Sequence, residues 1–122
     1  MTSPAESYQL IHVRLEDDVA IITFRGANSM FEGEKVDHVA GELFDLLEIW
    51  PTNKILLDLG NIYFMSSAML AQLVRIQRIM RTKKGRLRLC APRPAIQEAF
   101  KVSKFDKFFE IFPDSASALK KF

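Results

Sequence analysis

The stretch that decides the fold of this chain is ILLDLGNIYFMSSAML, residues 55–70. It begins with a nearly continuous apolar run, which is typical of a strand covered on both faces in a parallel sheet. It ends in two adjacent serines, Ser66 and Ser67, where a helical pattern starts. Such a serine can cap the helix by accepting a hydrogen bond from an unpaired backbone N–H. It can also carry chemistry at the strand-to-helix loop, and the residues alone leave both roles open.

Apolar spacing outward from this stretch predicts alternating strands and helices. The predicted strands are residues 10–15, 19–24, 54–60, 86–90 and 108–112. The predicted helices are residues 33–50, 66–82, 92–102 and 114–122. The first helix has an inward stripe made of Val36, Val39, Ala40, Leu43, Leu46 and Leu47. Residues 25–29 are expected to form a loop, and Gly85 is expected to close the second helix in a left-handed cap.

This order of elements predicts an α/β fold. The first two strands form a hairpin, so the sheet is expected to be mixed but mostly parallel, with about four to five strands and about four helices. The length of 122 residues fits a single domain covering residues 1–122, with residues 1–8 as a loosely ordered start.

Composition excludes several classes of protein. The formal net charge of +2 is too small to indicate nucleic-acid or membrane binding. Cys90 is the only cysteine, so no intramolecular disulfide is possible. No apolar run is long enough to span a bilayer, and the N-terminus lacks the pattern of a signal peptide. Because the sequence shows no export signal and no disulfide, we expect a cytoplasmic protein.

The sequence offers no catalytic or metal-binding pattern. His12, His38 and Cys90 lack the spacing of metal ligands, and no phosphate-binding or dinucleotide-binding glycine motif is present. Asp58 completes no acid–base pair, and we expect it to bond loop amides and support the serine turn. We expect no cofactor, no metal and no enzymatic activity.

A basic run follows the serines. It consists of Arg75, Arg78, Arg81, Lys83, Lys84, Arg86 and Arg88. The simplest interpretation is a solvated helix face and strand edge. The alternative is a patch for an acidic protein surface; nucleic acid is disfavoured because no aromatic residues interleave with the cations.

Two segments resemble the STAS domain, the fold of bacterial anti-sigma factor antagonists. One is residues 55–70, where the family has a strand, a short loop with paired serines and a helix. The other is GRLRLCAPRPAIQEAFKVSKFDKFFEIFPDSASAL, residues 85–119, which is similar to the family's second half. The resemblance implies that Ser67, rather than Ser66, is the phosphoacceptor. It also implies a partner that is both anti-sigma factor and serine kinase, with a histidine-kinase-like ATPase domain, and whose binding phosphorylation stops.

The resemblance also implies a contact surface around the serines. The residues expected to contact the partner are Asn28, Ser29, Tyr63, Met65, Ser66, Ser67 and Ala68. Phe64 is a further candidate if it is exposed, whereas Met69 is expected inside. Met65 stands where the family has an acid, and Ala68 where it has glycine. The family's acidic motif after the second strand is replaced by residues 26–29, GANS.

Two functions from different classes follow. The first is a regulatory module of the anti-sigma factor antagonist type, switched at Ser67, and a monomer or weak homodimer. The second is a STAS scaffold or small-molecule-sensing subunit of a larger signalling assembly that is never phosphorylated; the loss of the two acids supports it. An enzyme is disfavoured, since nothing supplies a nucleophile with a base.

Overall fold

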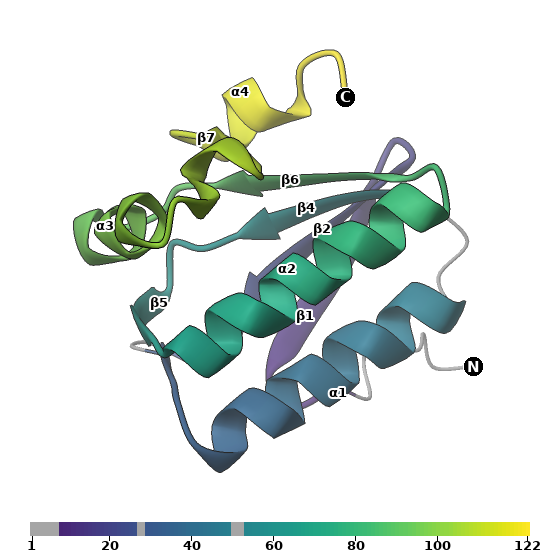
Figure 1. The fold of residues 1–122 in the computed structure, drawn as a ribbon. Helices are drawn as coiled ribbons and strands as arrows, with labels where there is room; N and C mark the ends of the chain where they lie inside the picture. The colour runs from purple at the N-terminus through teal and green to yellow at the C-terminus, as the bar shows by residue number, and fades with distance from the viewer. Residues whose placement is uncertain (1–7, 27–28, 50–52) are drawn as a thin grey trace.

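The computed structural model describes residues 8–26, 29–49 and 53–122 (Figure 1). The strands in these ranges are β1 (Ile11–Glu16), β2 (Val19–Phe24), β3 (Ser29–Phe31), β4 (Lys54–Asp58), β5 (Ile62–Met65), β6 (Arg86–Cys90) and β7 (Glu110–Phe112). The helices there are α1 (Glu34–Ile49), α2 (Ser67–Thr82), α3 (Pro94–Val102), the 3-10 turn η2 (Phe105–Lys107) and α4 (Ser115–Leu119).

The main sheet has five strands in the order β1-β2-β4-β6-β7. β1 and β2 are antiparallel, as expected for the predicted hairpin. The pairs β2–β4, β4–β6 and β6–β7 are all parallel. This mixed, mostly parallel sheet with four helices confirms the predicted fold class.

Both faces of the sheet are covered, which explains the continuous apolar run in β4. Helices α1 and α2 lie side by side on one face, and α4 lies on the other (Figure 1). Ile55 and Leu57 belong to the main core with α1 and α2. Leu56 points the opposite way and packs in a smaller cluster with Ala118 of α4. A strand buried on both faces needs apolar residues at every position rather than at alternate ones.

The predicted inward stripe of α1 is confirmed, since all six of its residues are buried. The outer side of α1 holds the start of the described chain. Tyr8 is buried and its hydroxyl donates to Asp45 Oδ2 at 2.6 Å. Glu42 accepts the backbone N–H groups of Gln9 and Leu10 at 2.7 and 2.8 Å. The expectation of a loosely ordered start is therefore wrong at Tyr8, and residues 1–7 lie outside the described ranges.

A small second sheet, β3–β5, was not predicted. Its two strands are parallel, with Met30 opposite Phe64 and Phe31 opposite Met65. Phe31 is fully buried and meets Phe24 edge to face at 5.2 Å between ring centroids. Strands β3 and β5, neither of them predicted, thus pair with each other, and α2 begins directly after β5.

The predicted cap at Gly85 is wrong by one residue. Lys84 takes the left-handed conformation, with φ of 57°, and its N–H donates to Arg81 O at 3.0 Å. Gly85 N–H donates to Met80 O at 2.7 Å, which completes a Schellman motif. Glycine is needed at position 85 for a different reason: a Cβ there would lie 2.7 Å from the carbonyl oxygen of Asn53.

Arg88 does not belong to the exposed basic run. It is 5% exposed, on the face of the sheet that α4 covers. Its guanidinium donates to the carbonyl oxygens of Ala118, Lys120 and Lys121 at 2.8, 2.7 and 3.0 Å, and lies 4.6 Å from the ring centroid of Phe122. Arg88 therefore holds the C-terminal segment against the sheet.

Candidate functional site

The first of the two serines caps helix α2. Ser66 is extended, with φ −70° and ψ 164°, and its Oγ accepts the backbone N–H of Met69 at 3.2 Å. Its own N–H donates to Phe31 O at 3.0 Å. One residue thus satisfies a backbone donor of the helix and links the helix to β3.

The second serine is the first residue of α2 and is exposed. Within the described ranges its hydroxyl makes no hydrogen bond. The unpaired N–H groups of the first turn and the helix dipole give this end of α2 a partial positive charge. The hydroxyl that could carry a modification is therefore separate from the hydroxyl that the helix requires.

Replacing Ser66 with alanine is expected to lower the free energy of unfolding by about 1 kcal/mol, because the N–H of Met69 loses its acceptor. Ser67→Ala is the matched control and is expected to leave stability unchanged. Urea denaturation of both variants measures the difference. Equal losses at the two positions would show that Ser66 does not act as the cap.

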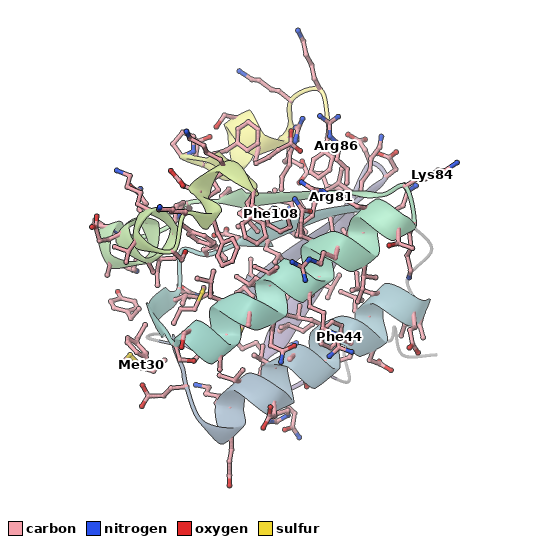
Figure 2. The ribbon with its side chains drawn as sticks, in the orientation of Figure 1. Met30, Phe44, Arg81, Lys84, Arg86 and Phe108 are labelled. Atoms are coloured by element: carbon pink, nitrogen blue, oxygen red, sulfur yellow. The ribbon has the colours of Figure 1, made fainter. Side chains whose placement is uncertain are left out.

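Exposed apolar side chains lie on the β3–β5 sheet next to this helix start. Met30, Tyr63 and Phe64 are 47%, 41% and 41% exposed. Figure 2 shows Met30 at the end of the molecule where α2 begins. Arg93 lies 3.7 Å from the centroid of the Tyr63 ring, and its Nε donates to Gly60 O at 2.9 Å. A cation held on an aromatic ring thus borders an apolar surface.

The loop between β4 and β5 is fixed by its own polar side chains. Asp58 Oδ1 accepts the N–H of Gly60 at 2.9 Å, and Asn61 Nδ2 donates to Phe24 O at 3.1 Å. These bonds hold the loop that leads into β5. That Asp58 supports the serine turn stays a prediction. The hydrogen bond between Asp58 and Gly60 is the contact through which Asp58 would do so.

The structure brings only part of the predicted contact set to the surface. Tyr63 and Ala68 are exposed beside Ser67. Ser29 and Met65 are 2% and 7% exposed, so their side chains point inward and are not available to a partner without rearrangement. Asn28 lies outside the described residues. Met30 was not considered from the sequence, because nothing marked residues 29–31 as a strand with one outward position.

Chemistry-bearing groups elsewhere are few. Burial, with smaller contributions from the charges of Asp58 and Asp114, raises the pKa of the Cys90 thiol to about 12, so this thiol stays protonated at neutral pH. In the described ranges, no group of three or more His, Cys, Asp and Glu side chains is placed to hold a metal ion. None of the helices there is long and apolar enough to span a bilayer.

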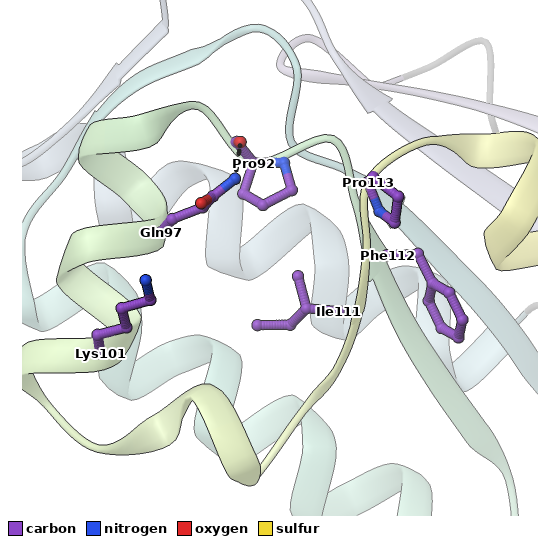
Figure 3. A pocket seen from close by; sticks show the side chains of 6 residues that line it. All are labelled: Pro92, Gln97, Lys101, Ile111, Phe112 and Pro113. Atoms are coloured by element: carbon purple, nitrogen blue, oxygen red, sulfur yellow. Dashed lines mark hydrogen bonds between the residues drawn. The ribbon is translucent and has the colours of Figure 1, made fainter.

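A hollow of about 250 Å³ lies between α3 and β7 (Figure 3). Its lining consists of Pro92, Gln97, Lys101, Ile111, Phe112 and Pro113. The Gln97 side chain donates to Pro92 O at 3.1 Å. Lys101 is the charged residue of the lining. The hollow offers a cation beside apolar surface.

The sequence from β1 to α4 can now be compared with known families. The model of the STAS domain family matches residues 11–118. This chain belongs to the STAS domain family. The family resemblance seen in residues 55–70 and 85–119 is thereby confirmed. None of the curated proteins matches the sequence.

Several solved structures have the fold of this STAS domain. The anti-sigma factor antagonist (STAS) domain protein from Planctomyces limnophilus is 24% identical, with a TM-score of 0.78, over 89% of this chain and 94% of that one. An anti-sigma factor antagonist from Mycobacterium paratuberculosis is 17% identical, with a TM-score of 0.78, over 89% of each chain. The Bacillus cell fate determinant SpoIIAA, in its phosphorylated form, is 13% identical, with a TM-score of 0.67, over 91% and 97%. This STAS domain is thus similar in fold to these anti-sigma factor antagonists.

Proposed function

We propose that this STAS domain is a regulator of the anti-sigma factor antagonist type. It binds an anti-sigma factor with a histidine-kinase-like ATPase domain through the surface around the start of α2. Phosphorylation of Ser67 by that partner ends the binding and so controls transcription through a sigma factor. The observation that carries the proposal is the division of labour between the serines: Ser66 caps α2, and the Ser67 hydroxyl is exposed and unbonded within the described ranges.

The helix start can accept a phosphate without unfolding. A phosphoserine carries about −1.5 to −2 charges at neutral pH. At a helix N-terminus a negative charge is favourable by about 0.3–1 kcal/mol. The first turn of α2 contains no acidic residue that would repel it. The phosphate therefore acts on the partner, by charge and desolvation, rather than on the fold.

The apolar surface beside Ser67 gives the partner something to bury. Met30, Tyr63 and Phe64 are exposed on β3 and β5, and aromatic and methionine side chains are enriched at protein interfaces. Ser67 stands at the border of this surface. A partner that covers the apolar side chains would also have to remove water from a phosphate on Ser67. This desolvation would disfavour binding.

Mass spectrometry of the protein isolated from its own host, growing and stressed and with phosphatases inhibited, tests the proposal. Phosphate is expected on Ser67, with an occupancy that changes between the two conditions. The Ser67→Ala chain is expected to lose the modification, and the Ser66→Ala chain to keep it. Full peptide coverage without phosphate under either condition contradicts the switch.

A second function is favoured by the hollow between α3 and β7. The ammonium group of Lys101 beside Ile111 and Phe112 suits a small molecule that has a carboxylate and an apolar part. In this alternative the domain is a sensing or scaffold subunit that is not phosphorylated. A rise in melting temperature with short-chain carboxylates, abolished by Lys101→Gln, would support it.

A further inference from the structure

The two helices that lie side by side on the sheet carry opposite charge. Helix α1 contains the acidic residues Glu34, Asp37, Glu42, Asp45 and Glu48 and a single basic residue, Lys35. Helix α2 contains Arg75, Arg78 and Arg81 and no acidic residue. Lys83 and Lys84 follow at the end of α2. Arg86 lies on β6 and pairs with Glu110, so it does not belong to the helix layer. The small net charge of the chain hides this separation.

The charges of the two helices do not neutralise one another. Ion pairs among the described residues join α1 only to itself, through His38 and Glu42, and none joins α1 to α2. Asp37 and Glu48 are exposed on α1, and Arg75 and Arg78 are exposed on α2. Glu42 and Asp45 are occupied by the start of the described chain. The exposed side of the helix layer that remains presents Asp37 and Glu48 of α1 beside Arg75 and Arg78 of α2.

The seam between the helices is shaped for contact. Figure 2 shows Phe44 between α1 and α2, and the guanidinium of Arg75 lies 4.7 Å from its ring centroid. A hollow of about 250 Å³ follows the seam, lined by Phe44, Leu47, Glu48, Arg75, Ile79 and Lys83. Halfway along α1, Gly41 is exposed, and a Cβ there would meet nothing within 4 Å. Glycine inside a helix is destabilising relative to alanine, and packing within the described chain does not require it here.

We infer that the α1–α2 layer is a self-association surface and that its occupant is a second copy of this chain. In a two-fold symmetric dimer the same patch is used by both subunits, so the patch must be complementary to itself. A surface with one acidic and one basic half meets this requirement. An axis parallel to the helices, above the seam, places α1 of each copy over α2 of the other and forms the favourable contact twice.

The charge pattern also selects among possible symmetries. A two-fold axis above the layer that runs across the helices instead would place α1 over α1 and α2 over α2. Each contact would then oppose like charges, which disfavours association. The pairing of α1 with α2 is therefore the arrangement that the charges allow. The inference does not depend on phosphorylation of Ser67.

Charge exchange between the two halves tests the inference. One variant, Arg75→Glu/Arg78→Glu, reverses the basic half. Another, Glu34→Lys/Asp37→Lys/Glu48→Lys, reverses the acidic half, because lysines then outnumber the remaining acids of α1. In sedimentation velocity, the wild type is expected to form a dimer at about 0.1 M salt and to dissociate at about 1 M, where charges are screened within about 3 Å. Each variant alone is expected to be monomeric. An equimolar mixture is expected to form a heterodimer, because both contacts are again between opposite charges.

A matched control distinguishes an effect of charges on the α1–α2 layer from an effect of the net charge of the protein. Lys101→Glu/Lys120→Glu changes the net charge by the same amount as the arginine variant, at exposed positions on α3 and after α4. It is expected to dimerise like the wild type, and circular dichroism checks that every variant is folded. A wild type that stays monomeric at low salt overturns the inference, and the layer is then left to an acidic partner protein or to solvent. A dimer that survives both reversals, or variants whose mixture stays monomeric, overturns the pairing of α1 with α2.

Discussion

Ser67→Glu is expected to weaken binding to the anti-sigma partner about a hundredfold, which corresponds to about 2.8 kcal/mol. The carboxylate stands at the first position of α2, three residues after the exposed Phe64 of β5. Binding would have to desolvate this charge without offering it a partner. The melting temperature is expected to stay that of the wild type or to rise slightly, since a negative charge is favourable at a helix N-terminus.

Titration calorimetry with a histidine-kinase-like anti-sigma factor from the same genome measures the binding loss, and Ser67→Gln is its control. Glutamine has nearly the same size and shape as glutamate but no charge. It is expected to bind much more tightly than the glutamate variant if charge is what ends the interaction. Equal losses in the two variants would mean that bulk, not charge, disrupts the contact. A glutamate variant that binds like the wild type would remove the switch from the proposed function.

Arg88→Met is expected to lower the free energy of unfolding by about 3 kcal/mol. The buried guanidinium donates to three carbonyl oxygens, those of Ala118, Lys120 and Lys121. Methionine fills part of the space but leaves these acceptors without their charged donor. The loss is expected to appear in urea denaturation and as faster amide hydrogen exchange in α4, which otherwise packs on the sheet face around Leu56 and Cys90 and on β7.

Arg86→Met is the matched control for Arg88→Met. Arg86 lies two residues earlier on the same strand, is exposed, and pairs with Glu110 at 3.3 Å. An exposed ion pair is worth about 0–1 kcal/mol, so this variant is expected to remain close to the wild type. If Arg88→Met lowers the free energy of unfolding no more than Arg86→Met does, the C-terminal segment is held by its apolar contacts alone.

The elements with long apolar patterns were the easiest to predict from the sequence. Helices α1 and α2 and strand β4 carry enough periodic residues to be recognised locally. Strands β3 and β5 have three and four residues, and they pair with each other although the whole of α1 and β4 lies between them in the sequence. A pairing between segments distant in sequence leaves no local signal, so neither segment was predicted as a strand.

Side-chain direction was harder to predict than secondary structure. The alternating residues of β6 suggested that Arg88 faces water, but α4 and the C-terminal residues cover that face. Met65 was expected to contact the partner, but it is buried where β5 pairs with β3. At the end of α2, glycine was the natural choice for a left-handed residue, yet a close approach to Asn53 requires glycine at position 85 and leaves the strained position to Lys84.

The sequence predicted where the candidate site lies, but it did not predict which of the two serines caps the helix. Two serines at a helix start are equivalent in the sequence, and either can cap the helix. The backbone decides between them, since only Ser66 has the extended conformation of a cap while Ser67 is already helical. The family resemblance pointed to the same residue for phosphorylation, for reasons unconnected with capping.

Because the cap and the exposed hydroxyl belong to different residues, mutation can alter one without disturbing the other. A single base change at codon 67 could remove the hydroxyl, or restore it, in a protein that folds as before. Under the proposed function, one copy could after a gene duplication become constitutively active while its sibling stayed regulated. Selection on the signalling network would then act at a position where the stability of the domain places almost no constraint.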